Sequence, residues 1–141
     1  MVKRPRVALI DDDPNFMDLF VRAMQVECDQ VTIKRYNTGT DLLSDLLAST
    51  HSDCPHLILM DLSLPGRNGI EVAQAVRQMH SFRAIPILLL TSSDQPKEVQ
   101  HAYEQGLNAY ISKPFSYREM KVLVKQICDY WLTAGQLPNL E

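Results

Sequence analysis

The sequence predicts an α/β fold in which a doubly wound, five-stranded parallel sheet of order 2-1-3-4-5, flavodoxin-like, is flanked by five helices. Short apolar runs alternate with segments of helical periodicity five times along the 141 residues. Three runs are continuously apolar, as in strands buried on both faces, and two are mixed, as in edge strands. If the crossovers are right-handed, the order 2-1-3-4-5 places the two mixed strands, the second and the fifth, at the edges of the sheet.

The three buried strands are expected at Val7–Ile10, Leu57–Met60 and Ile87–Leu90. Val31–Tyr36 alternates apolar and polar residues, and Ala109–Ser112 is short and mixed, so both are expected at edges.

Helices are expected between the strands because apolar residues recur three and four positions apart. Asp13 is expected to cap the first helix after Pro14, and Gly106 to end the fourth, which begins near Pro96. Asn68 with Glu71, and Ser116 with Glu119, have capping-box spacing. The apolar stripes are Phe16, Leu19, Phe20, Ala23 and Met24; Leu42, Leu43, Leu46 and Leu47; Val72, Ala73, Val76 and Met79; Val99, Ala102 and Tyr103; and Met120, Leu123, Val124, Ile127, Cys128 and Trp131.

Composition indicates a single domain over 1–141, with its core at about 5–132 and a short tail at 133–141. Hydrophobic residues make up 45% of the chain, enough for one core, and the net charge is -3. No basic run suggests nucleic-acid binding, and no apolar run approaches the length that spans a bilayer. We therefore expect a cytoplasmic protein that binds neither nucleic acid nor membrane.

Three cysteines (Cys28, Cys54, Cys128) match no zinc or redox spacing, so we expect reduced thiols with packing roles. Four scattered histidines (His51, His56, His80, His101) do not predict a metal site.

Polar residues follow four of the expected strands. Asp11-Asp12-Asp13 follows the first, Asp61 the third, Thr91-Ser92 the fourth and Lys113-Pro114 the fifth. Taken singly, each has an ordinary explanation: an aspartate at a strand end is a turn former or cap, a threonine is a β-former and a lysine is solvated. The carboxyl ends of the strands, however, bring these residues to one edge, beside the switch point where such folds bind ligands.

Asp11, Asp12 and Asp61 would crowd like charges together, which disfavours ionisation unless a cation is present. Oxygen ligands alone suit a hard ion, Mg²⁺ or Mn²⁺. Lys113 and Thr91 would face that ion across a gap that fits a phosphoryl group.

Four segments, VALIDDDP, LILMDLSLPGRNG, PILLLTSS and AYISKPF, occur in the order and strand context of a known family. On these segments the chain resembles the receiver domain of bacterial two-component response regulators, from about Val7 to the last helix. The resemblance implies a phosphoprotein that works in phosphorelay signal transduction. It also implies that the chain is not an enzyme, beyond catalysing its own phosphorylation and dephosphorylation.

The resemblance also implies the site residues. Asp61 would be the phosphoacceptor, assisted by Lys113 on a phosphoryl oxygen and by the Thr91 hydroxyl. Mg²⁺ would be held by Asp12, Asp61 and the carbonyl of Ser63, with Asp11 acting through water, while the backbone N–H groups of Leu62 and Ser92 would bind the phosphoryl group.

Signalling is expected to pass through Thr91 and Tyr110. As Thr91 moves toward the phosphoryl group, the Tyr110 ring would turn inward and remodel the face formed by the fourth helix, fifth strand and fifth helix. The alternative is a tyrosine that simply packs on an edge strand. Ser92 stands where the family usually has alanine or glycine, and the small residues Ser63 and Ser93 are expected to admit water to the phosphoryl group.

Partners follow from the same resemblance. A sensor histidine kinase would supply the phosphoryl group, and a downstream protein target would receive the signal. The ending DYWLTAGQLP resembles single-domain regulators paired with bacteriophytochromes, which suggests a kinase of that type and a homodimer through Tyr130, Trp131 and Leu132. Alternatively, Trp131 closes the core.

Three other functions remain open on sequence alone. The chain could be a pseudo-receiver that docks partners without phosphorylation, or an intermediate carrier in a phosphorelay. A phosphatase or phosphotransferase acting through an aspartyl intermediate is disfavoured, because such enzymes place a second aspartate where Ser63 stands.

Overall fold

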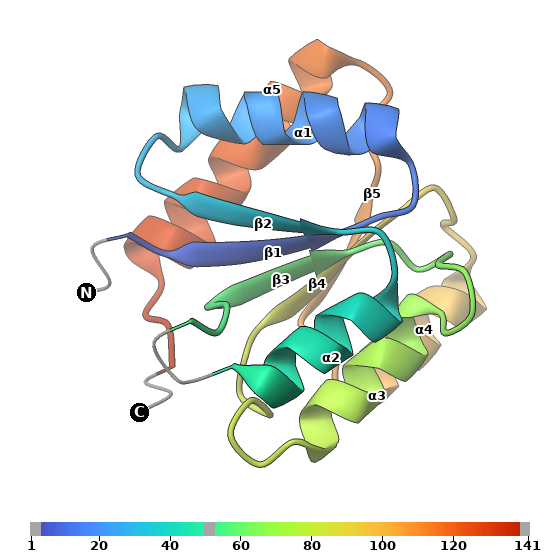
Figure 1. Cartoon of the computed structure of the whole chain (residues 1–141). Helices are drawn as coiled ribbons and strands as arrows, with labels where there is room; N and C mark the ends of the chain where they lie inside the picture. Colours follow the sequence, from blue (N-terminus) through green and yellow to red (C-terminus); the bar gives the residue numbers. More distant parts are fainter. Residues whose placement is uncertain (1–3, 50–52, 139–141) are drawn as a thin grey trace.

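A computed structural model of the chain describes residues 4–49 and 53–138. His51 and the end of the expected tail lie outside the described residues. Strands and helices alternate as predicted (Figure 1). The strands are β1 (Arg6–Ile10), β2 (Thr32–Tyr36), β3 (Leu57–Met60), β4 (Ile87–Thr91) and β5 (Ala109–Ser112). The helices are α1 (Pro14–Glu27), α2 (Gly39–Ala48), α3 (Gly69–Gln78), α4 (Pro96–Glu104) and α5 (Tyr117–Ile127), and α5 continues into a π-helical segment, η1 (Cys128–Ala134).

The five strands form one parallel sheet in the order β2-β1-β3-β4-β5, which confirms the predicted topology. Helices α1 and α5 cover one face of the sheet, and α2, α3 and α4 cover the other (Figure 1). Three boundaries differ from the prediction by one residue: β1 starts at Arg6 and β4 ends at Thr91. The third is the start of β2 at Thr32, because the N–H of Val31 closes a turn onto the carbonyl of Cys28.

Two apolar cores lie on opposite faces of the sheet. Side chains alternate between them along each central strand, so that Ile10 and Met60 join the core under α2, α3 and α4, whereas Leu9 and Leu59 join the core under α1 and α5. Every residue of β3 and β4 is buried. This burial on both faces is the reason that the central strands appear in the sequence as unbroken apolar runs.

Most of the predicted helix ends are confirmed. The carboxylate of Asp13 accepts hydrogen bonds from two N–H groups of α1, and Asn68 and Glu71 form a complete capping box on α3. Gly106 follows α4 with φ +92°, which favours glycine. The box at α5 is only half formed, because the Glu119 carboxylate accepts from the N–H of Phe115 instead of Ser116.

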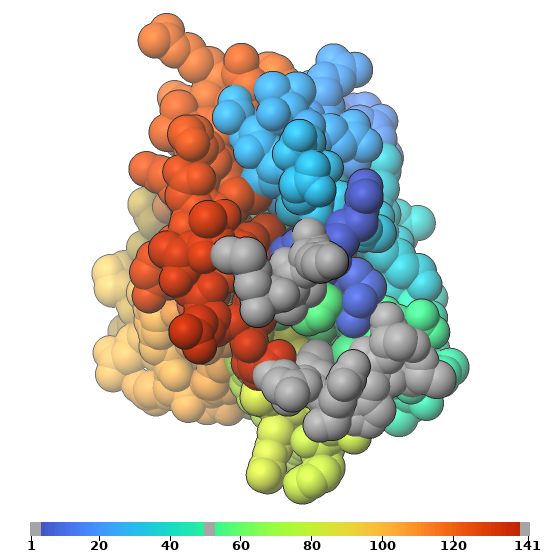
Figure 2. Space-filling model, turned by 90° about the vertical axis from the view of Figure 1, so that its left-hand side faces the viewer, coloured from blue at the N-terminus to red at the C-terminus, as the bar shows by residue number. Residues whose placement is uncertain are grey.

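The expectation of three reduced cysteines is wrong for two of them. Cys28, at the end of α1, and Cys128, at the start of η1, form a disulfide, with their Cα atoms 6.3 Å apart. Both residues are buried where α1 packs on α5, and Figure 2 shows the light-blue end of α1 against the red α5–η1 segment. Cys54 is buried in the other core.

Trp131 packs partly buried against the core under α1 and α5, together with Leu132. Of the three residues expected to form a dimer patch, only Tyr130 is largely exposed, at 62%. The placement of Trp131 therefore favours the alternative in which it closes the core. None of the helices in the described ranges has the length and apolar character needed to cross a membrane.

Candidate functional site

Three carboxylates meet at the carboxyl edge of the sheet. Asp11 directly follows β1 and Asp61 directly follows β3, and the two adjacent strands are tied by the Asp61 N–H, which donates to the carbonyl of Ile10 at 2.9 Å. Carboxylate oxygens of Asp11, Asp12 and Asp61 all lie within 4.8 Å of one another. Asp11 and Asp61 are buried, at 1% and 7% exposure, whereas Asp12 is exposed.

Backbone groups fix the orientation of the two buried carboxylates. Oδ1 of Asp11 accepts the N–H of Asp13 at 2.9 Å, and Oδ1 of Asp61 accepts the N–H of Ser63 at 3.3 Å. Helix α3 begins next to the backbone of Asp61. If residue 69 had a side chain, its Cβ would lie only 2.6 Å from the backbone oxygen of Asp61. Glycine at that position therefore lets α3 start against the backbone of the acidic residue.

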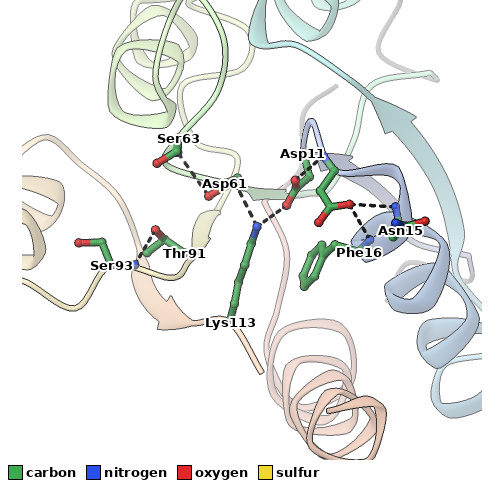
Figure 3. A network of polar contacts seen from close by, with 9 residues as sticks. Asp11, Asn15, Phe16, Asp61, Ser63, Thr91, Ser93 and Lys113 are labelled. Atoms are coloured by element: carbon green, nitrogen blue, oxygen red, sulfur yellow. Dashed lines mark hydrogen bonds and ion pairs between the residues drawn. The ribbon is translucent and has the colours of Figure 1, made fainter. Parts of the chain in front are cut away.

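Lys113 bridges the two buried carboxylates from the end of β5. Its Nζ lies 2.8 Å from Oδ2 of Asp11 and 3.2 Å from Oδ2 of Asp61 (Figure 3). The Lys113 N–H donates to the carbonyl of Thr91 at 2.9 Å, which continues the pairing of β4 with β5 and aims the side chain into the pocket. The Lys113 side chain is only 15% exposed.

Burial and charge act together on these groups. Burial raises the pKa of the Asp11 carboxyl, and hydrogen bonds from Lys113 and from the backbone of Asp13 only partly oppose this. Burial also lowers the pKa of the Lys113 ammonium, but hydrogen bonding to Asp11 and the charges of Asp11 and Asp61 outweigh it, so that the net pKa is raised. The pocket therefore holds a charged lysine against crowded acidic groups.

Thr91 and Tyr110 form the other side of the site. Thr91 is buried, and its Oγ1 accepts the N–H of Ser93 at 3.2 Å. Asp11 and Thr91 lie on opposite sides of Asp61 (Figure 3). Tyr110 packs partly buried against the core, and burial raises the pKa of its phenol, with hydrogen bonds to Ser93 and Thr91 opposing.

The structure brings most of the predicted residues to one edge. Carboxylate oxygens of Asp11, Asp12 and Asp61 lie within 4.8 Å of one another. Lys113 contacts Asp11 and Asp61, and the N–H of Ser63 also contacts Asp61. Leu62 is buried and its carbonyl accepts the N–H of Gly69, while Ser92 is exposed beside Thr91. The roles assigned to these residues stay predictions.

Two further residues were not singled out in the sequence. The ring of Phe16 lies 4.4 Å from the Lys113 ammonium, and the Glu98 carboxylate accepts hydrogen bonds from the hydroxyls of Ser93 and Tyr110. Phe16 appeared in the sequence only as part of an apolar stripe. Its place four residues after Asp12, in the first turn of α1, is the signal that could have marked it as a neighbour of the site.

The donor set suits a hard divalent cation. Three carboxylates offer one oxygen each within a small volume, and two of them are buried next to a single ammonium, which leaves the group with more acidic than basic charges. Oxygen donors without nitrogen or sulfur are what Mg²⁺ and Mn²⁺ accept in proteins. The residues present therefore fit the predicted class of metal.

A parallel sheet of this order with three acidic groups and a lysine at its carboxyl edge is the arrangement of a signalling receiver. The sequence matches the family described as response regulator receiver domain over residues 7–125, so the chain belongs to this family of two-component signalling proteins.

Individual relatives agree with this assignment. Over 88 residues the chain is 34% identical to response regulator Rcp1 of Synechocystis, covering 62% of this chain and 60% of Rcp1. It is 36% identical over 85 residues to the probable methanogenesis regulatory protein FilR2 of Methanothrix harundinacea, covering 60% of this chain and 55% of FilR2. The aligned part of the chain thus spans less than two thirds of these curated relatives.

Solved structures show the same fold. The phosphorylated cyanobacterial phytochrome response regulator RcpA superposes with a TM-score of 0.86 at 25% identity, covering 96% of this chain and 99% of RcpA. The Mn²⁺-bound form of Rcp1 gives a TM-score of 0.84 at 25% identity, covering 95% and 99%. The chain is therefore similar to phytochrome response regulators, as the sequence predicted.

Proposed function

We propose that this receiver domain accepts a phosphoryl group on Asp61 from a phosphohistidine of a sensor kinase, in the presence of Mg²⁺. In that transfer the N–P bond of the donor breaks, an O–P bond forms on the Asp61 carboxylate, and the imidazole leaves. The observation that carries the proposal is the bridge from Lys113 to both buried carboxylates at the edge where such sheets bind ligands.

The side chains have separate tasks in this proposal. Asp12, Asp61 and the Ser63 carbonyl would hold the cation, with Asp11 acting through water. The bound cation would neutralise charge on the phosphoryl oxygens. Lys113 would donate to one phosphoryl oxygen, and Thr91 with the N–H groups of Leu62 and Ser92 would bind the others. Positioning and charge neutralisation are what a protein supplies to a loose phosphoryl-transfer transition state.

The proposal extends to partners. The similarity to RcpA, whose name describes a phytochrome response regulator, supports a phytochrome-type sensor kinase as the donor. Phosphorylation would change the conformation of Thr91 and Tyr110, and through them the face formed by α4, β5 and α5. This face would contact a downstream protein or a second copy of the chain. A phosphotransfer screen against phytochrome-type kinases tests the donor, and transfer from unrelated kinases alone would refute this part.

Acetyl phosphate provides the direct test of the acceptor. With Mg²⁺, the wild-type chain is expected to gain the mass of one phosphoryl group, and removal of divalent cations is expected to prevent this. Asp61→Asn should not be labelled, because an amide is a poor nucleophile. Asp29→Asn is the matched control, since Asp29 is exposed at the end of α1 away from the site.

The outcomes separate the alternatives. Absence of labelling in the wild-type chain would refute the proposal and favour a docking module that works without phosphorylation. Labelling that persists in Asp61→Asn would place the acceptor elsewhere. Labelling followed by transfer to a second histidine-containing protein would identify an intermediate carrier in a phosphorelay.

A further inference from the structure

The Lys113 ammonium has an uncharged neighbour as well as its two carboxylates. The centroid of the Phe16 ring lies 4.4 Å from Nζ, within the range of a cation–π contact (Figure 3). The lysine side chain is only 15% exposed, so water screens this contact weakly. Phe16 and Lys113 come from opposite ends of the chain, on α1 and just after β5.

The Phe16 ring is held in place from two directions. The backbone N–H of Phe16 donates to the carboxylate of Asp13, the residue that caps α1, at 3.3 Å, which fixes the backbone that carries the ring. The ring stacks on Phe20 one turn further along α1, with centroids 5.5 Å apart and planes 28° apart. Phe20 is fully buried, so the stack anchors the partly buried Phe16 ring to the core. The position of the ring therefore does not depend on Lys113.

The carboxylate contacts and the aromatic contact of the Lys113 ammonium are expected to respond differently when a cation and a phosphoryl group bind. Asp11 and Asp61 contact the ammonium now, and they are also the groups assigned to the cation. Any turn of these carboxylates toward a cation weakens their hold on Lys113. An aromatic ring has no charge to give to a metal, so its contact with the ammonium persists.

We propose that Phe16 is a positioning residue, whose ring holds the Lys113 ammonium where it can donate to a phosphoryl oxygen. This inference rests on the proposed phosphorylation of Asp61 and deepens it. Phe16 itself touches neither the acceptor nor the phosphoryl group and acts only through Lys113. Its loss is expected to slow phosphorylation without abolishing it.

The test compares substitutions that keep or remove the ring. Phe16→Tyr keeps the aromatic face, whereas Phe16→Leu and Phe16→Met keep apolar bulk without it. The rate constant of labelling by acetyl phosphate in saturating Mg²⁺ is measured for each, together with the dissociation constant of beryllofluoride. We expect Phe16→Leu and Phe16→Met to be slower by about threefold to tenfold, the range of a partly shielded cation–π contact, and Phe16→Tyr to stay within about twofold of wild type.

A second pair in the chain provides a matched control. The ammonium of Lys121 lies 5.4 Å from the ring of Tyr117 on α5, so Tyr117→Leu removes a similar contact that does not involve the acidic pocket. Its labelling rate should equal that of wild type. Thermal unfolding of every variant checks that the fold is kept.

The outcomes are distinct. Equal rates for wild type, Phe16→Leu and Phe16→Met, or a Phe16→Tyr variant as slow as these two, would overturn the role of Phe16 while leaving the proposed function intact. A wild-type chain that is not labelled at all would overturn both. Recovery of rate and of beryllofluoride affinity by tyrosine alone supports the inference, because a purely structural role would be met by any apolar residue of similar size.

Discussion

The hydroxyl of Tyr110 donates a hydrogen bond to the backbone carbonyl of Ser93, 2.7 Å away. This bond joins β5 to the loop between β4 and α4. The Glu98 carboxylate at the start of α4 accepts hydrogen bonds from the hydroxyls of both residues. The ring packs partly buried against the core. Tyr110 therefore has a direct connection to α4.

Removing only the hydroxyl of Tyr110 should loosen the start of α4. Tyr110→Phe keeps the ring but leaves the Ser93 carbonyl and Glu98 without this donor, at a cost of about 1 kcal/mol. Amide hydrogen exchange over residues 93–99 is expected to be about fivefold faster, as measured by mass spectrometry or NMR. Tyr130→Phe, on an exposed ring, is the control. Unchanged exchange in Tyr110→Phe would show that the ring packs there without restraining α4.

The lifetime of the phosphorylated state is expected to depend on Ser63 and Ser93. Ser63 is exposed beside Asp61, so Ser63→Met should exclude water and slow hydrolysis several-fold. Ser93→Tyr should act in the same direction, although it must also break the contact with Glu98. Loss of the phosphoryl mass over time measures both. Ser81→Met, on an exposed turn after α3, should not change the lifetime, and a long wild-type half-life that neither substitution alters would contradict the prediction.

Asp45 should make the stability depend on acid pH. Hydrogen bonds from Lys34 and then from Tyr36 lower the pKa of this carboxyl below its ordinary 3.8. A lowered folded-state pKa means that the contribution to stability is present above the unfolded pKa and is lost as the pH falls through the folded pKa. Because the side chain is 36% exposed, the contribution is at most about 1 kcal/mol.

Asp45→Asn tests this dependence by urea unfolding at several pH values. The difference in unfolding free energy from wild type should be largest above about pH 5 and should shrink at lower pH. Asp29→Asn, at an exposed carboxyl, is the control for the loss of one acidic side chain. A difference between wild type and Asp45→Asn that is independent of pH would refute the prediction.

Reduction of the Cys28–Cys128 disulfide should lower the stability of the domain. The bridge closes a loop with a sequence separation of 100 residues, for which loss of chain entropy in the unfolded state is worth about 2 to 5 kcal/mol. Urea unfolding with and without reductant measures the difference. The double variant Cys28→Ser, Cys128→Ser should be insensitive to reductant. Alkylation of both cysteines in unreduced, unfolded protein would show that the bridge does not form.

The parts of the fold that depend on local pattern could be predicted from sequence. Continuous apolar runs placed the central strands, and Asn68 with Glu71 identified the start of α3, because strand burial and capping depend on nearby residues. The carboxyl ends of the strands then placed Asp11, Asp61 and Lys113 together, since parallel topology alone decides which edge they share.

Contacts between distant helices could not be predicted. Cys28 and Cys128 meet only because α1 and α5 pack side by side at particular rotations, which a stripe of apolar residues does not specify. The contact of Phe16 with Lys113 depends in the same way on the seating of α1 above the end of β5. Ser116 and Glu119 have the spacing of a capping box, yet the Glu119 carboxylate accepts from the N–H of Phe115, one residue before Ser116. The sequence does not determine which of two adjacent N–H groups is bound.

The covalent bond between Cys28 and Cys128 also determines how the domain would respond to mechanical force. All strands from β2 to β5 lie in the chain between these cysteines, and only β1, α1 and the segment after Cys128 lie outside. A pull applied to the two ends would therefore be transmitted through the sulfur bridge and would bypass four fifths of the sheet. In an optical trap the oxidised molecule would lengthen by only a short step, whereas the same molecule with free thiols would extend along its whole contour.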